Sequence, residues 1–447
     1  MSGDPRGTQD SQGPAASTPP SRADEQRLNR DISRLGFAAM SLNGIIGAGI
    51  FGLPAVAAAR AGDFGPWMFV ICGVLTLTIV LSFARASSLV RETGGVIVYA
   101  SNAFGPFIGF QTGWLSYLSR VTSAAANANL MVTYMAWFWA PLDTHPWRGV
   151  ALTLILGALT WLNAVGVRNS IGLMYVFTVM KLLPLSLLIL FGLGKVDAAT
   201  LFGASWPEMS EFGGTVLVLL YAFVGFEGSV VNAGEGRNPR RDLPRALVTT
   251  TVVIAVFYFL IQWVSSATLP ELAESRTALA DVATVLFGAV GAAVLTLGAA
   301  FSIGGNLMAS ILSAPRMTWA LALDGSMPRW FAAVHERHRT PHHSIWFYGI
   351  LSLALALTGT FVWLAVMSTL VRLLAYMVSI AALPRLARQT DAPELAFPLP
   401  GGLLIPGVAM VLCFWLMLQA PLSAWLTLAG FTAAGTGIYF AMKRRRA

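Results

Sequence analysis

Charged residues are scarce in this 447-residue chain, where Asp, Glu, Lys and Arg together make up 11%. A soluble domain of average composition carries about 25%, so water cannot be the solvent for most of the chain. Cysteine is rarer still, and Cys72 and Cys413 lie far apart inside apolar runs. This excludes a disulfide framework or a cysteine metal knuckle. The first 30 residues lack an apolar stretch, which excludes a cleavable signal and predicts a disordered cytosolic tail over residues 1–35.

Motifs for ATP-driven or enzymatic chemistry are missing as well. The chain has no P-loop, so ATP is not expected to drive it directly. It has no paired acids, His–Ser arrangement or H-E-x-x-H helix near an expected membrane interface, so we predict neither an enzyme nor a cofactor. Four histidines gather between the eighth and ninth expected spans, but a loop rich in Arg and Pro is a common context for them, and we predict no metal. The sequence leaves open whether this loop, residues 335–343, binds anything.

Apolar residues, by contrast, make up 56% of the chain, and the mean hydropathy is +0.67. A membrane-spanning helix needs about 20 mostly apolar residues. Twelve stretches meet that condition, and an even number places both termini on one side. The predicted spans are 36–59, 65–89, 111–139, 149–167, 172–193, 213–234, 246–269, 286–312, 343–360, 361–383, 403–420 and 422–441.

Lysine and arginine are distributed unevenly between the two sides. With the N-terminus inside, the inner segments hold 22 of the 29 basic residues and the outer segments hold four. Cytoplasmic loops of membrane proteins carry this excess, so we expect an inner-membrane protein with both termini in the cytoplasm. The pI near 9.9 is then a topology signal. A nucleic-acid partner is not expected, because the chain has no soluble basic domain to bind one.

Glycine interrupts the first span. Gly44, Gly47, Gly49 and Gly52 fall within nine residues, and each costs a straight helix about 1 kcal/mol relative to alanine. Such a stretch is expected to unwind where backbone groups meet a ligand, an ion or trapped water. The spacing also fits a dinucleotide-binding pattern, but no strand precedes it, so that context is absent. A glycine-rich helix-packing face is the other interpretation, and the two are compatible.

The sixth span is interrupted in the same way, around Gly225, and Glu227 lies beside the interruption. One broken span therefore opens the chain and another opens its second half, five spans later. Paired interruptions of this kind indicate a transporter built from inverted repeats. Exposed N–H groups of a half-helix attract a carboxylate, and exposed carbonyls attract an ammonium group. Backbone chemistry alone thus favours an amino-acid substrate.

Several segments together resemble the amino acid–polyamine–organocation family of permeases, and its bacterial amino-acid permeases in particular. The resemblance covers roughly residues 36 to 400. It is carried by Gly44–Pro54 in the first span, by Glu92–Gly95 before the third, by Phe223–Glu227 with Ala233–Ala246 at the sixth, and by Ala314–Pro328 after the eighth.

The resemblance implies an all-α membrane protein of about twelve transmembrane helices with a leucine-transporter-like fold. Two five-helix inverted repeats, residues 36–193 and 213–383, would precede two accessory helices at 403–441. It also implies which atoms bind an amino acid. The substrate carboxylate would meet N–H groups near Gly47, Ala48 and Gly49, and its amine would meet carbonyls of Ile45, Tyr221 and Val224.

Two further positions matter for specificity in this resemblance. Phe223 matches an aromatic position beside the site, where it would gate access or pack on the substrate side chain. The third-span position that often carries a polar substrate contact is Ala124 here, which leaves the side-chain specificity open.

Lys181 lies midway along the fifth span, where a lysine costs about 3 kcal/mol on insertion scales. It is too far from either end to reach water along its stem, so we expect it to face a partner or a cavity. In similar permeases a lysine here resembles a substitute for the sodium ion of sodium-coupled relatives. Its ammonium would bond carbonyls near Gly44 and Ile45 and a hydroxyl such as that of Ser302, and it could release its proton during the cycle.

Glu227 is the carboxylate that lies well inside a span, and it is a candidate proton carrier or gate. A structural ion pair with Arg120 is the alternative, and one pair can serve as both. Arg120 and Arg372 also lie within spans. Either arginine could bind a substrate carboxylate or pair with a carbonyl at a kink.

The sequence thus predicts a secondary active transporter of amino acids or related amines that works by alternating access without sodium. Its energy source would be proton symport or amino-acid exchange. A nutrient sensor or channel that keeps the transporter fold is the alternative. The expected partners are the substrate, protons and the lipid bilayer, and the sequence does not reveal the oligomeric state.

Overall fold

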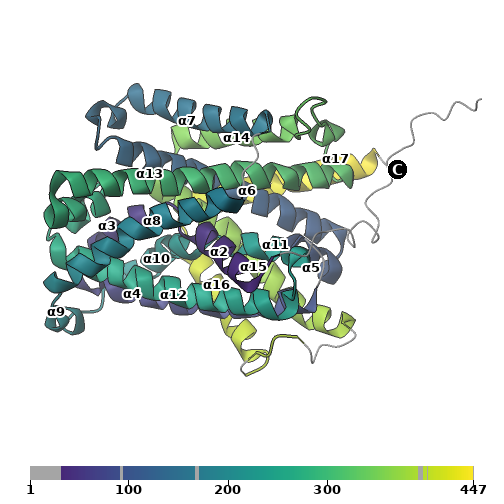
Figure 1. Ribbon diagram of the computed structural model, residues 1–447. Coiled ribbons are helices and arrows are strands. Elements are labelled where there is room, and N and C mark those ends of the chain that lie inside the picture. Colours follow the sequence, from purple (N-terminus) through teal and green to yellow (C-terminus); the bar gives the residue numbers. More distant parts are fainter. Residues whose placement is uncertain (1–31, 91–93, 167–170, 391–395, 400, 446–447) are drawn as a thin grey trace, which may run out of the picture.

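The computed structural model describes residues 32–90, 94–166, 171–390, 396–399 and 401–445, and this part of the chain is helical with no strand. Most of the long helices run side by side along one axis (Figure 1). The helices are α2 (Arg34–Ile45), α3 (Gly49–Ala61), α4 (Gly65–Leu89), α5 (Val96–Phe104), α6 (Pro106–Met135), α7 (Trp147–Ala164), α8 (Ile171–Gly192), α9 (Ala198–Phe202), α10 (Met209–Leu219), α11 (Glu227–Val231), α12 (Pro239–Thr268), α13 (Ala278–Leu323), α14 (His342–Thr358), α15 (Phe361–Gln389), α16 (Leu404–Leu418) and α17 (Leu422–Arg444).

Each of the twelve predicted spans overlaps one of these helices or a helix pair. By length and composition, five helical stretches of the described residues are apolar enough to cross a membrane. A sixth is added if α16 and α17, which meet at 112°, count as one broken span. Several membrane-spanning helices are therefore present, and the number twelve stays a prediction.

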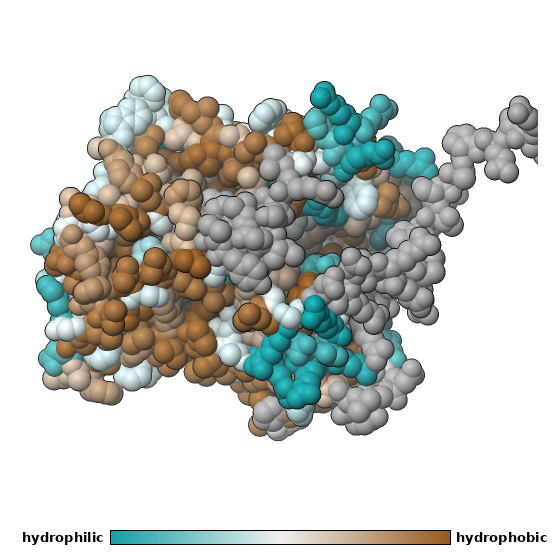
Figure 2. Space-filling model, in the orientation of Figure 1, coloured by the Kyte–Doolittle hydropathy of each residue, from teal (hydrophilic) through white to brown (hydrophobic). Residues whose placement is uncertain are grey.

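The outer surface of the bundle is apolar. Figure 2 shows a broad hydrophobic face, with hydrophilic residues gathered mainly towards the end where the C-terminus lies. Leu190 on α8, Val253 on α12 and Val290 on α13 are each more than half exposed. A protein in water rarely leaves so large an apolar surface uncovered, so lipid is the natural solvent for this face.

The interior holds polar and charged side chains that lipid would reject. Lys181, Glu227 and Arg372 are all at least nine-tenths buried. They lie within a scaffold in which α4 packs along α12, and α6 packs against both α13 and α15. Buried charges need partners, and the breaks in α2–α3 and α10–α11 supply several of them.

The helices depart from the predicted spans at two places. Residues 1–31 of the expected tail lie outside the described residues, but Ile32 already pairs with the loop after α11, and α2 begins at Arg34. The Ile32 N–H donates to the Glu235 carbonyl (3.1 Å), and the Ile32 carbonyl accepts from Arg237 (3.0 Å). The predicted eighth span begins near Gly288, where the long helix α13 kinks because this glycine adopts a φ of 69°.

Candidate functional site

The first break separates α2 from α3. Helix α2 ends at Ile45, and Ile46 leaves helical geometry with a ψ of 90°. The last carbonyls of a helix lack partners in the helix itself. Here the Asn306 amide donates to the carbonyls of Asn43 and Gly44, at 3.4 and 3.3 Å. The Ile45 carbonyl accepts from the Gly47 N–H at 2.9 Å.

The other side of this break presents backbone N–H groups. Helix α3 begins at Gly49, and no side chain caps it. Among the described residues, the N–H groups of Ala48, Gly49 and Ile50 have no acceptor. Free N–H groups and the helix dipole together favour an anion such as a carboxylate. The open donors are therefore displaced by one residue from the predicted set, because the Gly47 N–H is already used.

The second break separates α10 from α11. A 3₁₀ turn at Leu220–Phe223 follows α10, and then Val224 becomes extended with a ψ of 156°. Gly225 has a φ of 119°, a conformation that L-residues with a side chain rarely adopt. Helix α11 resumes at Glu227, whose side chain accepts a hydrogen bond from the Gly225 N–H at 2.9 Å.

The two breaks touch each other. A Cβ atom built on Gly44 would lie 2.6 Å from the Gly225 carbonyl oxygen, so only hydrogen fits between the two backbones. One turn away, the hydroxyls of Ser41 and Ser229 join α2 to α11 at 2.8 Å. Glycine at both positions thus permits a direct backbone contact, and the interrupted spans that the sequence predicts lie side by side.

A cavity of about 420 Å³ opens beside the two breaks. This volume falls within the range of small-molecule sites. Its walls come from both breaks and from α6, α8, α13 and α15. Nine of the predicted site residues line it: Ile45, Gly47, Ala48, Gly49, Arg120, Lys181, Tyr221, Val224 and Glu227.

Phe223 does not line the cavity. Its ring is 1% exposed and packs against Tyr258 and Phe69, with centroids at 5.2 and 6.5 Å. A 3₁₀ turn has three residues per turn, so positions two apart, such as Tyr221 and Phe223, point to different sides. Tyr221 supplies an aromatic ring to this cavity, and a role for Phe223 beside the site stays a prediction.

Lys181 reaches the first break from α8. Its ammonium donates to the Ile46 carbonyl at 3.0 Å, and its side chain is 2% exposed. The expected carbonyl partners were those of Gly44 and Ile45, so the contact lies one residue further along. Ser302 is not a partner, because its hydroxyl has no hydrogen bond among the described residues.

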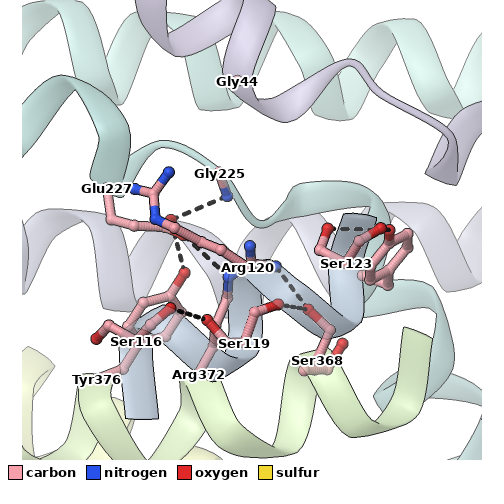
Figure 3. A network of polar contacts seen from close by, with 12 residues as sticks. Gly44, Ser116, Ser119, Arg120, Ser123, Gly225, Glu227, Ser368, Arg372 and Tyr376 are labelled. Atoms are coloured by element: carbon pink, nitrogen blue, oxygen red, sulfur yellow. Dashed lines mark hydrogen bonds and ion pairs between the residues drawn. The ribbon is translucent and has the colours of Figure 1, made fainter. Parts of the chain in front are cut away.

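Glu227 pairs with Arg372 rather than with Arg120, as Figure 3 shows. Its Oε1 atom lies 3.0 Å from Arg372 Nε, and its Oε2 atom accepts from the Tyr376 hydroxyl at 2.9 Å. The Arg372 Nη1 also donates to Ser368 at 3.1 Å. The sequence could not predict this pair, because it depends on α15 packing against the 3₁₀ turn Leu220–Phe223 of the second break.

We expect Glu227→Gln to destabilise the protein, because it leaves the buried Arg372 guanidinium without a counter-charge. Removing one member of a buried pair costs about 3–5 kcal/mol. A double-mutant cycle with Arg372→Gln measures this by thermal unfolding in detergent. The second substitution should cost much less in the Glu227→Gln background than alone, with a coupling energy above about 1 kcal/mol. Additive losses would contradict a coupled pair.

Sequence reasoning missed three polar residues of the cavity: Asn127, Ser123 and Asn306. The Tyr221 hydroxyl donates to Asn127 Oδ1 at 2.7 Å, and the Asn127 amide donates to Asn306 Oδ1 at 2.9 Å. Ser123 and the Tyr221 hydroxyl are 3.1 Å apart. Asparagine inside an apolar span was the available signal. Asn127 and Ser123, both on α6, supply the third-span polarity that Ala124, itself buried away from the cavity lining, does not.

The histidine loop forms a separate cluster. The rings of His342 and His343 have centroids 4.0 Å apart, and the ring of His335 lies 5.4 Å from that of His342. In the described part of the chain, no group of three or more His, Cys, Asp or Glu residues has an arrangement that could hold a metal ion. This cluster contributes nothing to the cavity lining.

Comparison with known proteins identifies similar chains across nearly the whole length. A family model described as "Amino acid permease" matches residues 32–441. The branched-chain amino acid permease BcaP of Bacillus subtilis is 27% identical over 94% of this chain and 94% of that protein. The serine/threonine exchanger SteT of the same organism is 27% identical over 95% of this chain and 99% of that protein. Its methylthioribose transporter is 26% identical over 94% of each chain.

Proposed function

This chain is a multi-pass membrane protein of the amino acid permease family, and we propose that it carries amino acids across the membrane by alternating access. The relatives are permeases and transporters, not enzymes. One observation carries the proposal: two broken helices meet at Gly44 and Gly225 and border one cavity. A cavity walled by backbone donors on one side and carbonyls on the other suits a zwitterion.

The substrate carboxylate binds at the start of α3, where the N–H groups of Ala48, Gly49 and Ile50 are open. Its ammonium group lies towards the carbonyls of Ile45, Tyr221 and Val224. The cavity also brings the Tyr221 hydroxyl and the amides of Asn127 and Asn306 within reach. These groups orient the substrate without adding charge.

Transport is independent of sodium in this proposal. The Lys181 ammonium already occupies the Ile46 carbonyl at the first break, so a fixed positive charge stands where a cation would otherwise bind. Exchange of one amino acid for another, or symport with a proton, then drives uptake. One relative being named an exchanger supports the first of these.

The proposed architecture comprises twelve transmembrane helices, with five-helix inverted repeats at 36–193 and 213–383 and accessory helices at 403–441. This proposal is supported by two broken helix pairs at corresponding places: α2–α3 stands at the start of the first repeat and α10–α11 at the start of the second. The distribution of Lys and Arg supports an inner-membrane location with cytoplasmic termini.

Uptake of labelled amino acids into proteoliposomes tests the function. We expect saturable, stereoselective uptake that is unchanged when choline replaces sodium and that increases when the vesicles contain unlabelled substrate or face an inward proton gradient. Beforehand, a panel of amino acids tested for thermal stabilisation in detergent selects the substrate, because a ligand of the folded state raises its melting point. Binding without flux would indicate a sensor, and non-saturable flux would indicate a channel.

A further inference from the structure

The charges that line the cavity do not balance. Of the described lining residues, Arg120, Lys181 and Arg372 are cationic and Glu227 is anionic. A neutral zwitterion leaves this excess unchanged. Positive charge that is partly withdrawn from water favours an anionic ligand. The cation whose N–H donors remain open to the cavity is therefore the one that a negatively charged substrate group would bind.

Arg120 and Lys181 form no ion pair with a described residue, although Glu227 lies within electrostatic range of Arg120 as well as of Arg372. Glu227 already interacts with the Arg372 guanidinium, the Tyr376 hydroxyl and the Gly225 N–H. Lys181 is buried against the Ile46 carbonyl. The half-buried Arg120 guanidinium makes one long hydrogen bond of 3.4 Å, to the neutral hydroxyl of Ser313. Most of its five N–H donors therefore remain available to a ligand.

Arg120 also lies close to the proposed substrate position. Figure 3 shows it on the same helix as Ser123 and close to the Gly225 break. Three residues of helix rise about 4.5 Å, and the Ser123 hydroxyl contacts Tyr221 at 3.1 Å. The start of α3 and Arg120 line the same cavity, so an amino acid whose α-carboxylate binds at the start of α3 can direct its side chain towards Arg120.

We propose that the preferred substrate carries a second carboxylate, as a dicarboxylic amino acid does, and that Arg120 binds this side-chain carboxylate. A planar guanidinium matches a carboxylate with two parallel hydrogen bonds. The inference rests on the proposed function and specifies its substrate class. The names of the relatives do not decide this point, because chains of similar identity are named for branched-chain amino acids, serine and threonine, and methylthioribose.

Thermal stabilisation by increasing concentrations of each amino acid, measured for the unaltered protein and for Arg120→Gln, tests the proposal. In the unaltered protein, aspartate or glutamate should raise the melting point more than asparagine, glutamine or leucine at equal concentration. Arg120→Gln should weaken binding of the acidic amino acid about 10- to 100-fold and change binding of neutral amino acids less than about threefold. Arg388→Gln is the matched control. It removes the same charge, but from an exposed position at the end of α15.

The outcomes separate this inference from the proposed function. If neutral amino acids bind and acidic ones do not, or if Arg120→Gln weakens both classes equally, the assignment of Arg120 is wrong while the carrier function stands. If no amino acid of any class binds or is transported, the proposed function fails first. Arg120→Lys keeps the charge but loses the paired donors, and it should recover part of the acidic selectivity.

Discussion

Gly225→Ala is expected to abolish transport and to destabilise the protein strongly. Gly225 has a φ of 119°, and its missing Cβ would point into the backbone of Gly44. A strained residue of this kind costs about 1–3 kcal/mol, and forcing an extra methyl group into a packed contact costs about as much again. Thermal unfolding in detergent and uptake into proteoliposomes measure the two effects.

Two glycines provide matched controls for this substitution. A Cβ at Gly228, on α11, or at Gly157, on α7, meets no atom within 4 Å. Gly228→Ala should leave the melting point nearly unchanged although it changes the cavity wall, and Gly157→Ala should preserve both stability and uptake. A Gly225→Ala protein that folds and transports normally would show that the contact between the two breaks is dispensable.

Lys181→Ala is expected to reduce uptake to the background of protein-free vesicles. The substitution removes the donor that holds the Ile46 carbonyl at the first break, so the broken segment loses its fixed charge. The melting point should fall less than transport does, because burying the Lys181 ammonium in the folded protein is itself costly. Lys181→Met, which keeps the apolar stem, should also be inactive, and Lys195→Ala, at an exposed position, should transport normally.

The measurement for Lys181 is uptake across a series of pH values, with sodium and with choline. Uptake by Lys181→Ala should stay at the background level at every pH, with sodium and with choline. Normal uptake with an unchanged pH profile would show that Lys181 has no part in coupling. A stable but inactive protein separates this effect from a failure to fold.

The sequence predicted the features that depend on local composition. Glycine punctuation located the breaks at Gly47 and Gly225, because glycine disfavours a continuous helix wherever it stands. A lysine in an apolar span predicted a partner or a cavity, and the family resemblance implied that the partner lies at the first break. The error of one residue, from Ile45 to Ile46, reflects how the chain leaves α2, which only the backbone angles determine.

Features that depend on tertiary contacts were not predictable in this way. The partner of Glu227 is Arg372, on a helix more than a hundred residues later in the chain. Asn306, on α13, donates to carbonyls of α2 that lie more than 260 residues earlier in the chain. Phe223 shows the same limit at short range, because its side chain faces Phe69 on α4 and Tyr258 on α12, and that packing is not encoded in the local sequence.

Helices α2 and α11 are joined at successive levels. The backbones meet at Gly44 and Gly225, the hydroxyls of Ser41 and Ser229 bond one turn away, and Ile32 pairs with Gly236 beyond them. Because α2 and α11 contact each other at several points along their length, we expect them to move together as one rigid unit. A displacement of α2 is therefore expected to carry Ile32 before it, and the loop after α11, in the same direction.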